Sequence, residues 1–186
     1  MAQYTGILCH VTSLPNGLKD AEKFIDYICD YGASLWQVLP ITPPDEHGSP
    51  YASPSAFAAW DSLGQSKSES MDADSYWLKD WLLFESLKLK FGDKPWHKWP
   101  KKYRDRDPNA LAGIVVDETA QARFMGRWKE IRDYANSKNV SLIGDLPIFV
   151  SHDSADVWAH RELFLLDNKG MPQVVAGVPP DYFSKK

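Results

Sequence analysis

The chain has 186 residues, and 21 Lys and Arg against 25 Asp and Glu give it a formal net charge of −4. Its hydrophobic content of 44%, with 8 residues each of Trp, Tyr and Phe, is enough for a packed core and excludes a disordered chain. No apolar run approaches the roughly 18 residues of a membrane span, and the first residues lack the pattern of a secretory signal. We therefore expect a cytoplasmic globular protein whose partners include neither a membrane nor, given the negative charge, a nucleic acid.

Three short apolar runs predict the strands of a parallel sheet, at residues 6–10, 35–39 and 140–150. The second run is almost continuously apolar, which is typical of a strand covered on both faces. Helical spacing between the first two runs predicts a helix from Asp20 to Tyr31, with Asp20 as its N-cap and Gly32 at its end. Strand, helix and strand in this order favour an α/β fold.

A helical insertion is predicted at about residues 61–139, between the second and third strands. Its first part, residues 62–69, is polar and predicts a surface loop. One helix is expected from a cap at residue 72 or 74 through residue 89, and a second from about residue 109 to 137. Both carry apolar residues at helical spacing.

The chain after the third strand predicts smaller elements. A short helix is expected to start near Ser154, and a hairpin is expected to join about residues 163–166 to 173–175. We treat residues 1–186 as a single domain.

The residues that follow each apolar run are the candidates for a site, because ligands of parallel α/β sheets bind where the strands end. They are His10, Thr12, Ser13, Asp45, Glu46, His47, Ser49, Tyr51, Asp145, His152 and Asp153. Aromatic rings, carboxylates and hydroxyls suit a sugar, whose apolar faces stack on rings while its hydroxyls need donors and acceptors. The structural alternatives are that Asp145 braces its own loop and that Tyr51 is an ordinary core or surface aromatic.

A metal site is not predicted. His152, Asp156 and His160 have the spacing of ligands on one helix face, but the helix is short and Trp158 intervenes, which favours capping or solvated roles. The chain also has only two cysteines, too few for a cysteine-built zinc site.

Three blocks of sequence carry a family resemblance. They are GILCHVTSLP (6–15), SLWQVLPITPP with GSPYASPSAFAA (34–44 and 48–59), and a long block that begins IGDLPIFVSHDSADVWAHRELF and ends VVAGVPPDYFS (143–184). Together they resemble the N-terminal part of the 4-α-glucanotransferases, or amylomaltases, of glycoside hydrolase family 77. The resemblance implies a partial (β/α)₈ barrel, transfer of α-1,4-glucan segments between maltooligosaccharides, and no cofactor or required metal.

The resemblance also implies which residues bind sugar. Tyr51 corresponds to an aromatic residue beside the cleaved bond, with Ser49 next to it. Asp145 matches a binding-site carboxylate rather than the nucleophile. Asp181 and Tyr182 lie in a stretch that matches a mobile loop over the cleft. No catalytic residue is assigned.

The carboxylates of the family reaction are missing from the matched blocks. Retaining glycosyl transfer needs a nucleophile and an acid/base carboxyl about 5 Å apart. The family motifs that resemble R-I-D-H-F-R-G and E-D-L-G do not occur in the sequence, and residues 60–71 are shorter than the same region of many members. We therefore expect a truncated, inactive protein whose open sheet edges are covered by self-association into a homo-oligomer.

Two other functions stay open. The first is a non-catalytic carbohydrate-binding or scaffold protein. The second is a hydrolase whose new active site forms between chains, with acid/base carboxyls drawn from Asp145, Asp153, Asp156 and Glu162.

Overall fold

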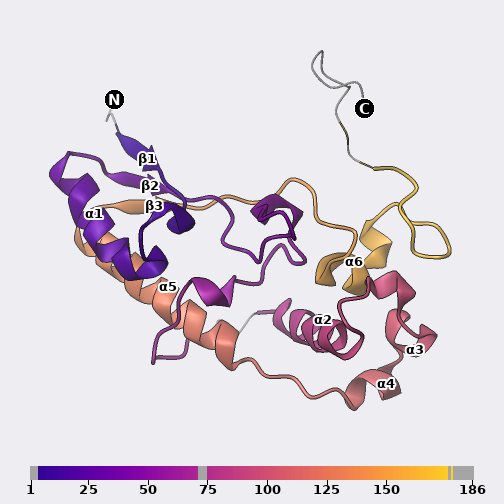
Figure 1. Cartoon of the computed structure of the whole chain (residues 1–186). Coiled ribbons are helices and arrows are strands. Elements are labelled where there is room, and N and C mark those ends of the chain that lie inside the picture. The colour runs from indigo at the N-terminus through magenta and orange to yellow at the C-terminus, as the bar shows by residue number, and fades with distance from the viewer. Residues whose placement is uncertain (1–3, 71–74, 176, 178–186) are drawn as a thin grey trace.

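The computed structural model describes residues 4–70, 75–175 and 177. Its three strands are β1 (Gly6–Leu8), β2 (Leu35–Gln37) and β3 (Ser141–Ile143), which form one parallel sheet with β2 in the middle (Figure 1). The predicted α/β class and its three parallel strands are confirmed. The strands are shorter than the apolar runs, because only three residues of each run pair with the neighbouring strand.

The register of the sheet places its side chains on two different faces. Ile7, Trp36 and Leu142 lie opposite one another and pack into the core. Leu8 and Ile143, on the other face, are 59% and 39% exposed. The prediction that β2 is covered on both faces is therefore wrong for the described residues, since helices cover one face only.

Helix α1 (Ala21–Asp30) connects β1 to β2 and packs along α5 (Thr119–Ser137). Gly32 ends α1 as predicted, with a φ of 80° that favours glycine. Asp20 occupies the N-cap position but makes no side-chain cap bond. Its carboxylate instead accepts hydrogen bonds from the backbone and side-chain amides of Asn16, so it holds the preceding turn.

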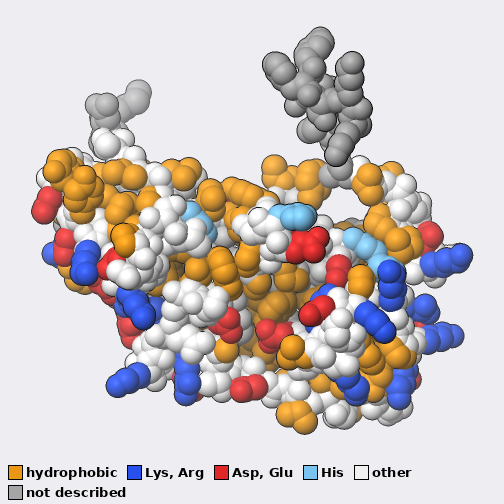
Figure 2. All heavy atoms as spheres, in the orientation of Figure 1, with side chains coloured by type: hydrophobic (Ala, Val, Ile, Leu, Met, Phe, Trp, Pro, Cys, Tyr) orange, Lys and Arg blue, Asp and Glu red, His pale blue; other side chains and the backbone are white. Residues whose placement is uncertain are grey.

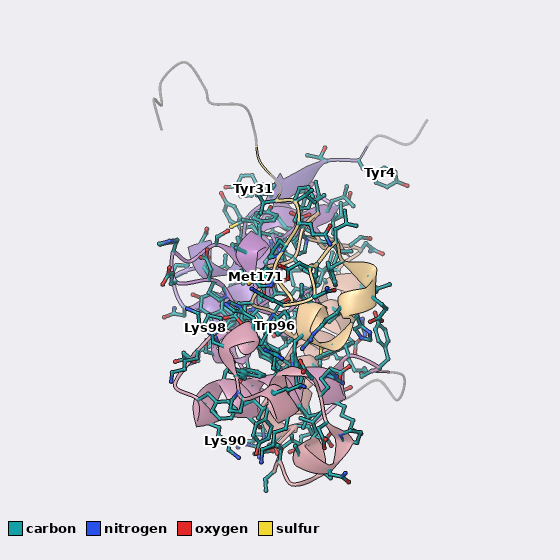
Figure 3. All side chains as sticks on the ribbon, turned by 90° about the vertical axis from the view of Figure 1, so that its right-hand side faces the viewer. Tyr4, Tyr31, Lys90, Trp96, Lys98 and Met171 are labelled. Carbon is teal, nitrogen blue, oxygen red and sulfur yellow. The ribbon has the colours of Figure 1, made fainter. Side chains whose placement is uncertain are left out.

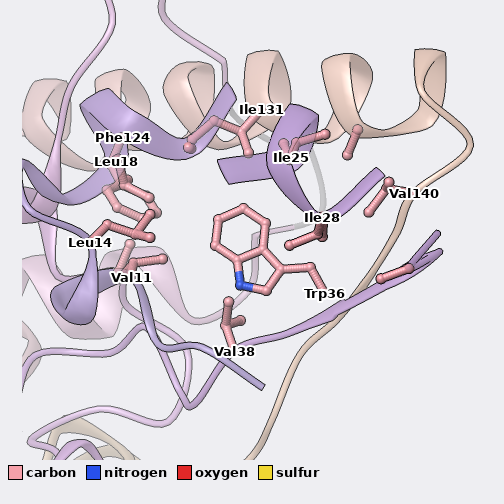
Figure 4. Packing of buried hydrophobic residues seen from close by; sticks show 14 residues of the cluster. Val11, Leu14, Leu18, Ile25, Ile28, Trp36, Val38, Phe124, Ile131 and Val140 are labelled. Atoms are coloured by element: carbon pink, nitrogen blue, oxygen red, sulfur yellow. The ribbon is translucent and has the colours of Figure 1, made fainter. Parts of the chain in front are cut away.

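Trp36 lies at the centre of the core that α1 and α5 build on the sheet (Figure 4). Its side chain is fully buried, and its indole Nε1 donates to the carbonyl oxygen of Cys9 at 2.7 Å. The surrounding apolar side chains come from both helices and from the turn after β1: Val11, Leu18, Ile25, Ile28, Phe124 and Ile131. This core fixes the end of β2, from which the loop that carries Tyr51 leaves.

A second core, rich in aromatic rings, lies beside the first. It is built by α2 (Leu78–Lys90), α3 (Lys101–Arg104), α4 (Pro108–Ala112) and α6 (Ala155–Ala159), seen from the side in Figure 3. Trp158 of α6 packs on Phe84 of α2 and on Trp99, with ring centroids 6.0 and 5.5 Å apart. The described residues also contain short 3₁₀ helices, at Val11–Ser13, Gly17–Asp20, Pro50–Ala52, Asp61–Leu63, Trp96–Lys98 and Arg161–Leu163.

The helical insertion differs from its prediction in two places. Helix α2 begins at Leu78, later than predicted, and its predicted caps at residues 72 and 74 lie outside the described residues. The helix expected at residues 109–137 is two helices, α4 and α5, because Gly113 ends α4 and the β-branched residues 114–116 that follow favour extended backbone.

The polar residues 62–69 lie at the surface and, beyond the 3₁₀ helix Asp61–Leu63, have no regular structure, so the predicted surface loop is confirmed. Ser66 and Ser70 donate backbone hydrogen bonds to carbonyl oxygens of α5, so this segment lies along that helix.

The elements after β3 are smaller than predicted. The helix near Ser154 is confirmed as α6, with the Ser154 hydroxyl accepting from the amide of Val157. The expected hairpin is reduced to a single antiparallel bridge between Leu166 and Pro172, because proline has no amide hydrogen to extend a ladder. Among the described residues, no helix is long and apolar enough to cross a membrane.

Candidate functional site

The loops that leave β2 and β3 meet at Tyr51 and Asp145. The Tyr51 hydroxyl donates to Oδ2 of Asp145 at 2.7 Å, and Oδ1 of the same carboxylate accepts from the amide of Leu146 at 2.8 Å. Both oxygens of Asp145 are thus occupied, and the carboxylate faces Tyr51. The sequence predicted both residues as members of one site, and the structure places them in direct contact.

The ring of Tyr51 is presented to solvent in a fixed direction. Its side chain is 44% exposed, while its hydroxyl is held by Asp145. The hydrogen bond to Asp145 raises the pKa of Tyr51, because a carboxylate that accepts from the phenol disfavours the phenolate. The phenol therefore stays neutral and its exposed ring face is available for stacking.

Ser49 is held by a closed loop just before Tyr51. Oδ1 of Asp45 accepts from the amides of His47 and Ser49, and the amide of Asp45 donates to the carbonyl oxygen of Ser49. These bonds use the backbone of Ser49 and fix its position. No hydrogen bond of its side-chain hydroxyl occurs within the described part of the chain, so the hydroxyl remains available to a ligand.

Two helices anchor the loop at residues 49–59, which we call the anchored loop. From α6, the amide of Ala155 donates to the carbonyl oxygen of Pro54 at 2.8 Å. Also from α6, the carboxylate of Asp156 accepts from the amide of Ala56 at 3.0 Å. Loops held by both backbone and side-chain bonds present their other side chains with little freedom, as a binding site requires.

Gln121 of α5 holds the other end of the anchored loop. Its side-chain oxygen accepts from the amide of Ala59 and its side-chain nitrogen donates to the carbonyl oxygen of Ala59, both at 2.9 Å. Gln121 is only 3% exposed. Asp156 and Gln121 are thus positioning residues, a role that the sequence analysis gave to neither. The sequence signal that could have revealed Gln121 is a glutamine on the apolar side of a predicted helix.

Asp156 is partly buried between the anchored loop and α2. Burial raises its pKa, an effect that the hydrogen bond from Ala56 opposes. The sequence named Asp156 as a candidate acid/base carboxyl of a new site and as a candidate metal ligand. Its contact with the loop backbone gives it a positioning role.

Three other candidates, His152, Asp153 and His160, contact groups other than Tyr51. His152 contacts the carbonyl oxygen of Gly170 through Nε2 at 2.7 Å, and His160 lies beside Asp80. Asp153 pairs with Lys88 at 2.8 Å. His152 precedes α6 and His160 follows it, so these residues do not share a helix face.

Among the other candidates, His10, Thr12 and Ser13 lie at the 3₁₀ helix Val11–Ser13 after β1, and Glu46 lies 3.6 Å from the ring of His47. Glu162 lies in the 3₁₀ helix Arg161–Leu163, 3.5 Å from the His160 ring. Asp181 and Tyr182, the predicted loop residues, lie outside the described residues. Within residues 4–70 and 75–175, no three side chains of the metal-binding types converge.

Comparison with known proteins identifies the family. The family model described as 4-alpha-glucanotransferase, of glycoside hydrolase family 77, matches residues 9–63 and 60–186. The chain belongs to this family. It is similar to 4-alpha-glucanotransferases of Thermus thermophilus, at 33% identity over 97% of this chain, and of Aquifex aeolicus, at 32% over 97%.

The family fold is also found in a solved structure. This 4-alpha-glucanotransferase relative resembles the amylomaltase from Streptococcus agalactiae in complex with acarbose, with a TM-score of 0.85 and 30% sequence identity. The match covers 98% of this chain and 51% of that protein. The chain also covers 49% of the Thermus protein and 50% of the Aquifex protein, so it spans about half the length of its relatives.

The chain is shortened near residue 60 relative to its family. The two matched segments meet at residues 60–63. The alignment with the Thermus protein spans 246 positions and 97% of this chain, about 180 of its 186 residues, so about 66 alignment positions have no counterpart here. This agrees with the shortening expected from the sequence. In the structure, the anchored loop ends where the family segment is missing.

Proposed function

We propose that this chain forms a sugar-binding wall of a 4-α-glucanotransferase fold and binds maltooligosaccharides or α-1,4-glucan through Ser49, Tyr51 and Asp145. Asp181 and Tyr182 belong to the same proposal as substrate-contacting residues. The observation that carries it is the hydrogen bond from Tyr51 to Asp145, which fixes an exposed aromatic ring where two strands end.

The polar groups around Tyr51 match what a sugar needs. A pyranose ring has an apolar face that packs on an aromatic side chain, and hydroxyls at its edge that need donors and acceptors. The exposed ring of Tyr51 offers the first, and the hydroxyl of Ser49 offers the second. The amylomaltase from Streptococcus agalactiae, whose fold this chain shares, holds acarbose in its solved structure. That complex supports the choice of ligand class.

We further propose that the chain of 186 residues binds glucan without transferring it. The family motifs for the nucleophile and the acid/base group do not occur in its sequence. Three candidate carboxylates are engaged otherwise: Asp145 with Tyr51, Asp156 with the anchored loop and Asp153 with Lys88. A pair of free carboxyls about 5 Å apart is what retaining chemistry would require.

Calorimetric titration with maltotriose tests the binding site. We expect saturable binding to the wild-type chain and at least about a fivefold weaker affinity for Tyr51→Ala, since the stacking surface is lost. Tyr31→Ala is the matched control, because Tyr31 is also exposed, at 75%, but is the C-cap residue of α1. Equal affinities of the wild type and Tyr51→Ala would contradict the proposal.

We also propose that the isolated chain self-associates with a second copy, through the face of the sheet that α1 and α5 leave open. The outer edges of β1 and β3 have no strand partner within the described residues, and Leu8 and Ile143 on that face are exposed. Hydrophobic side chains also gather along the upper edge of the molecule in Figure 2. A trough of about 530 Å³, lined by Ile148, Phe149 and Leu165 among others, follows β3.

Light scattering tests this self-association. A dimer or larger species at micromolar concentration is expected, and Phe149→Glu should shift it toward the monomer, since Phe149 is 65% exposed. A stable wild-type monomer with a cooperative melt would contradict it. A cytoplasmic location stays a prediction from the sequence.

A further inference from the structure

We propose that His97 and His152 form an acid-sensitive clasp, which holds the turn at residues 167–171 in place at neutral pH and releases it in weakly acidic solution. Leu166 and Pro172, at the two ends of this turn, line the trough that follows β3, and so does His152. The clasp therefore sets one side of the trough. It does not depend on sugar binding.

The turn is tied to the rest of the protein at Gly170. Nε2 of His152 lies 2.7 Å from the carbonyl oxygen of Gly170. Because a carbonyl oxygen can only accept, Nε2 carries a hydrogen and donates it. Gly170 also lies directly against Trp96, since a Cβ at this position would be 2.6 Å from Cη2 of the Trp96 ring. One hydrogen bond and one close packing contact thus hold the turn.

His97 packs on His152 and is fitted to its neutral form. The two imidazole rings are stacked, with 5.3 Å between centroids and 27° between planes. Nδ1 of His97 is buried and has no hydrogen-bond partner within the described part of the chain. A neutral ring can carry its hydrogen on Nε2, but a protonated ring carries one on each nitrogen. Protonation would therefore leave a buried N–H of a charged group without an acceptor.

The charges that face His97 agree with this preference. Burial lowers the pKa of His97 below its ordinary value of 6.5, and His152 and Lys98 lower it further, while Asp153 opposes them. The unfolded chain therefore binds more protons at this residue than the folded protein does. The stability due to neutral His97 is present above pH 6.5 and is lost as pH falls through the lowered pKa.

The other charged groups nearby offer little to a protonated His97. The carboxylate of Asp153 already accepts from Nζ of Lys88 at 2.8 Å and from the amide of Trp96 at 3.0 Å. The guanidinium of Arg161 lies over the Trp96 ring, 4.4 Å from its centroid, and has no acceptor. A positive charge on His97 thus gains no new partner in the present arrangement.

The turn has its own internal bonds, which weak acid should leave intact. Oδ1 of Asp167 accepts from the amides of Lys169 and Met171, at 2.8 and 2.9 Å. These backbone bonds lower the pKa of Asp167 below its ordinary value of 3.8, so its carboxylate stays ionised in weak acid. Acid should therefore detach the turn as a unit and not unfold it.

Protonation of His97 breaks the stack of the two histidines. The charged ring has to turn Nδ1 toward water, and it then no longer packs on His152. His152 loses the neighbour that fixes its ring beneath the carbonyl group of Gly170. The turn leaves Trp96, and one side of the trough opens.

NMR of the purified chain tests the clasp at Gly170. An α-hydrogen of Gly170 lies against the Trp96 ring, so the ring current displaces its signal from the usual glycine position. We expect the wild type to lose most of this displacement between about pH 8 and about pH 5, with the same midpoint as the ring hydrogens of His97. His97→Phe keeps a ring and takes up no proton, so its Gly170 signal should stay displaced. His47→Gln is the matched control, because the His47 side chain is 80% exposed, and it should follow the wild type.

Two results would overturn the clasp. The first is a wild-type Gly170 signal that does not move with pH, which needs no variant to observe. The second is a signal that moves in His97→Phe at the wild-type midpoint, because another group would then be the one that titrates.

His152→Phe gives an independent test, because it removes the donor to Gly170. The displacement of the Gly170 signal should then be lost already at neutral pH. A displacement that persists in His152→Phe would show that this hydrogen bond does not hold the turn.

Discussion

The hydroxyl of Tyr51 and the carboxylate of Asp145 are 94 residues apart in the sequence and 2.7 Å apart in the structure. This bond joins the loop after β2 to the loop after β3 at the carboxyl end of the sheet. It holds the phenol in place from its polar end and leaves the ring face free. The arrangement separates two roles, because Asp145 orients the ring and Tyr51 offers the surface for a sugar.

Removing only the hydroxyl of Tyr51 should weaken maltotriose binding less than removing the ring. In Tyr51→Phe the stacking surface remains and the bond to Asp145 is lost, so we expect about a two- to fivefold loss of affinity. Calorimetry beside the Tyr51→Ala variant measures the difference. A loss in Tyr51→Phe as large as in Tyr51→Ala would mean that the hydroxyl contacts the sugar itself.

Asp156 gives a prediction about how the anchored loop is held. Burial raises its pKa above the ordinary value of 3.8, so the folded protein binds more protons than the unfolded chain just above pH 3.8. The stability due to this group is thus fully present below pH 3.8 and is lost as pH rises through the raised pKa. Asparagine does not ionise, so Asp156→Asn avoids the loss of stability that the wild type shows as pH rises. Its side-chain oxygen still accepts from the amide of Ala56. At pH 7 the Asp156→Asn variant should therefore be at least as stable as the wild type.

The matched variant Asp156→Ala separates charge from hydrogen bonding. It leaves the amide of Ala56 without its acceptor, and we expect a cost of ~1–2 kcal/mol in the free energy of unfolding. Urea denaturation of both variants at pH 7 measures this. Equal destabilisation of Asp156→Asn and Asp156→Ala would show that the ionised carboxylate itself is required.

Gly126 on α5 is required by the segment that follows the anchored loop. A Cβ at this position would lie 2.0 Å from the carbonyl oxygen of Ser68, too close for any side chain. Gly126→Ala should therefore lower the melting temperature, even though alanine favours a helix by about 1 kcal/mol over glycine. Gly113→Ala is the control, because nothing lies within 4 Å of a Cβ there. Equal melting temperatures of Gly126→Ala and the wild type would show that residues 64–70 do not lie on α5.

The ion pair between Glu22 and Arg127 predicts sensitivity to acid. Both oxygens of Glu22 accept from the guanidinium, at 2.6 and 2.7 Å, and this pairing lowers the pKa of Glu22 below its ordinary value of 4.5. Its stability is present above pH 4.5 and is lost as pH falls through the lowered pKa. Glu22→Gln should be less stable than the wild type at pH 7, and the gap should narrow below pH 4 in thermal melts. A gap that stays constant with pH would exclude this pairing.

The sequence predicted the sheet well, because its strands are short apolar runs with clear ends. It also predicted that Tyr51 and Asp145 belong to one site, since parallel strands bring their carboxyl ends together. The contacts of Asp156 and Gln121 with the anchored loop were not predictable from periodicity, because they bond backbone groups 100 and 62 residues away. The break at Gly113 was missed because apolar residues on both sides kept a helical spacing.

The open face of the sheet was missed for a different reason. A continuous apolar run predicts that both faces of a strand are buried. It does not identify the helices or strands that pack against each face. Leu8 and Ile143 are apolar and exposed in the described structure. No helix among the described residues covers this face, and the chain spans about half the length of the relatives it matches.

One NMR sample of the purified chain with maltotriose tests the central proposal of binding without transfer. Saturation of protein signals should transfer to maltotriose, and the anomeric signals of the sugar should stay unchanged over a day. New signals of glucose and of longer maltooligosaccharides, growing faster than in the sugar alone, would contradict the account, as would the absence of any saturation transfer.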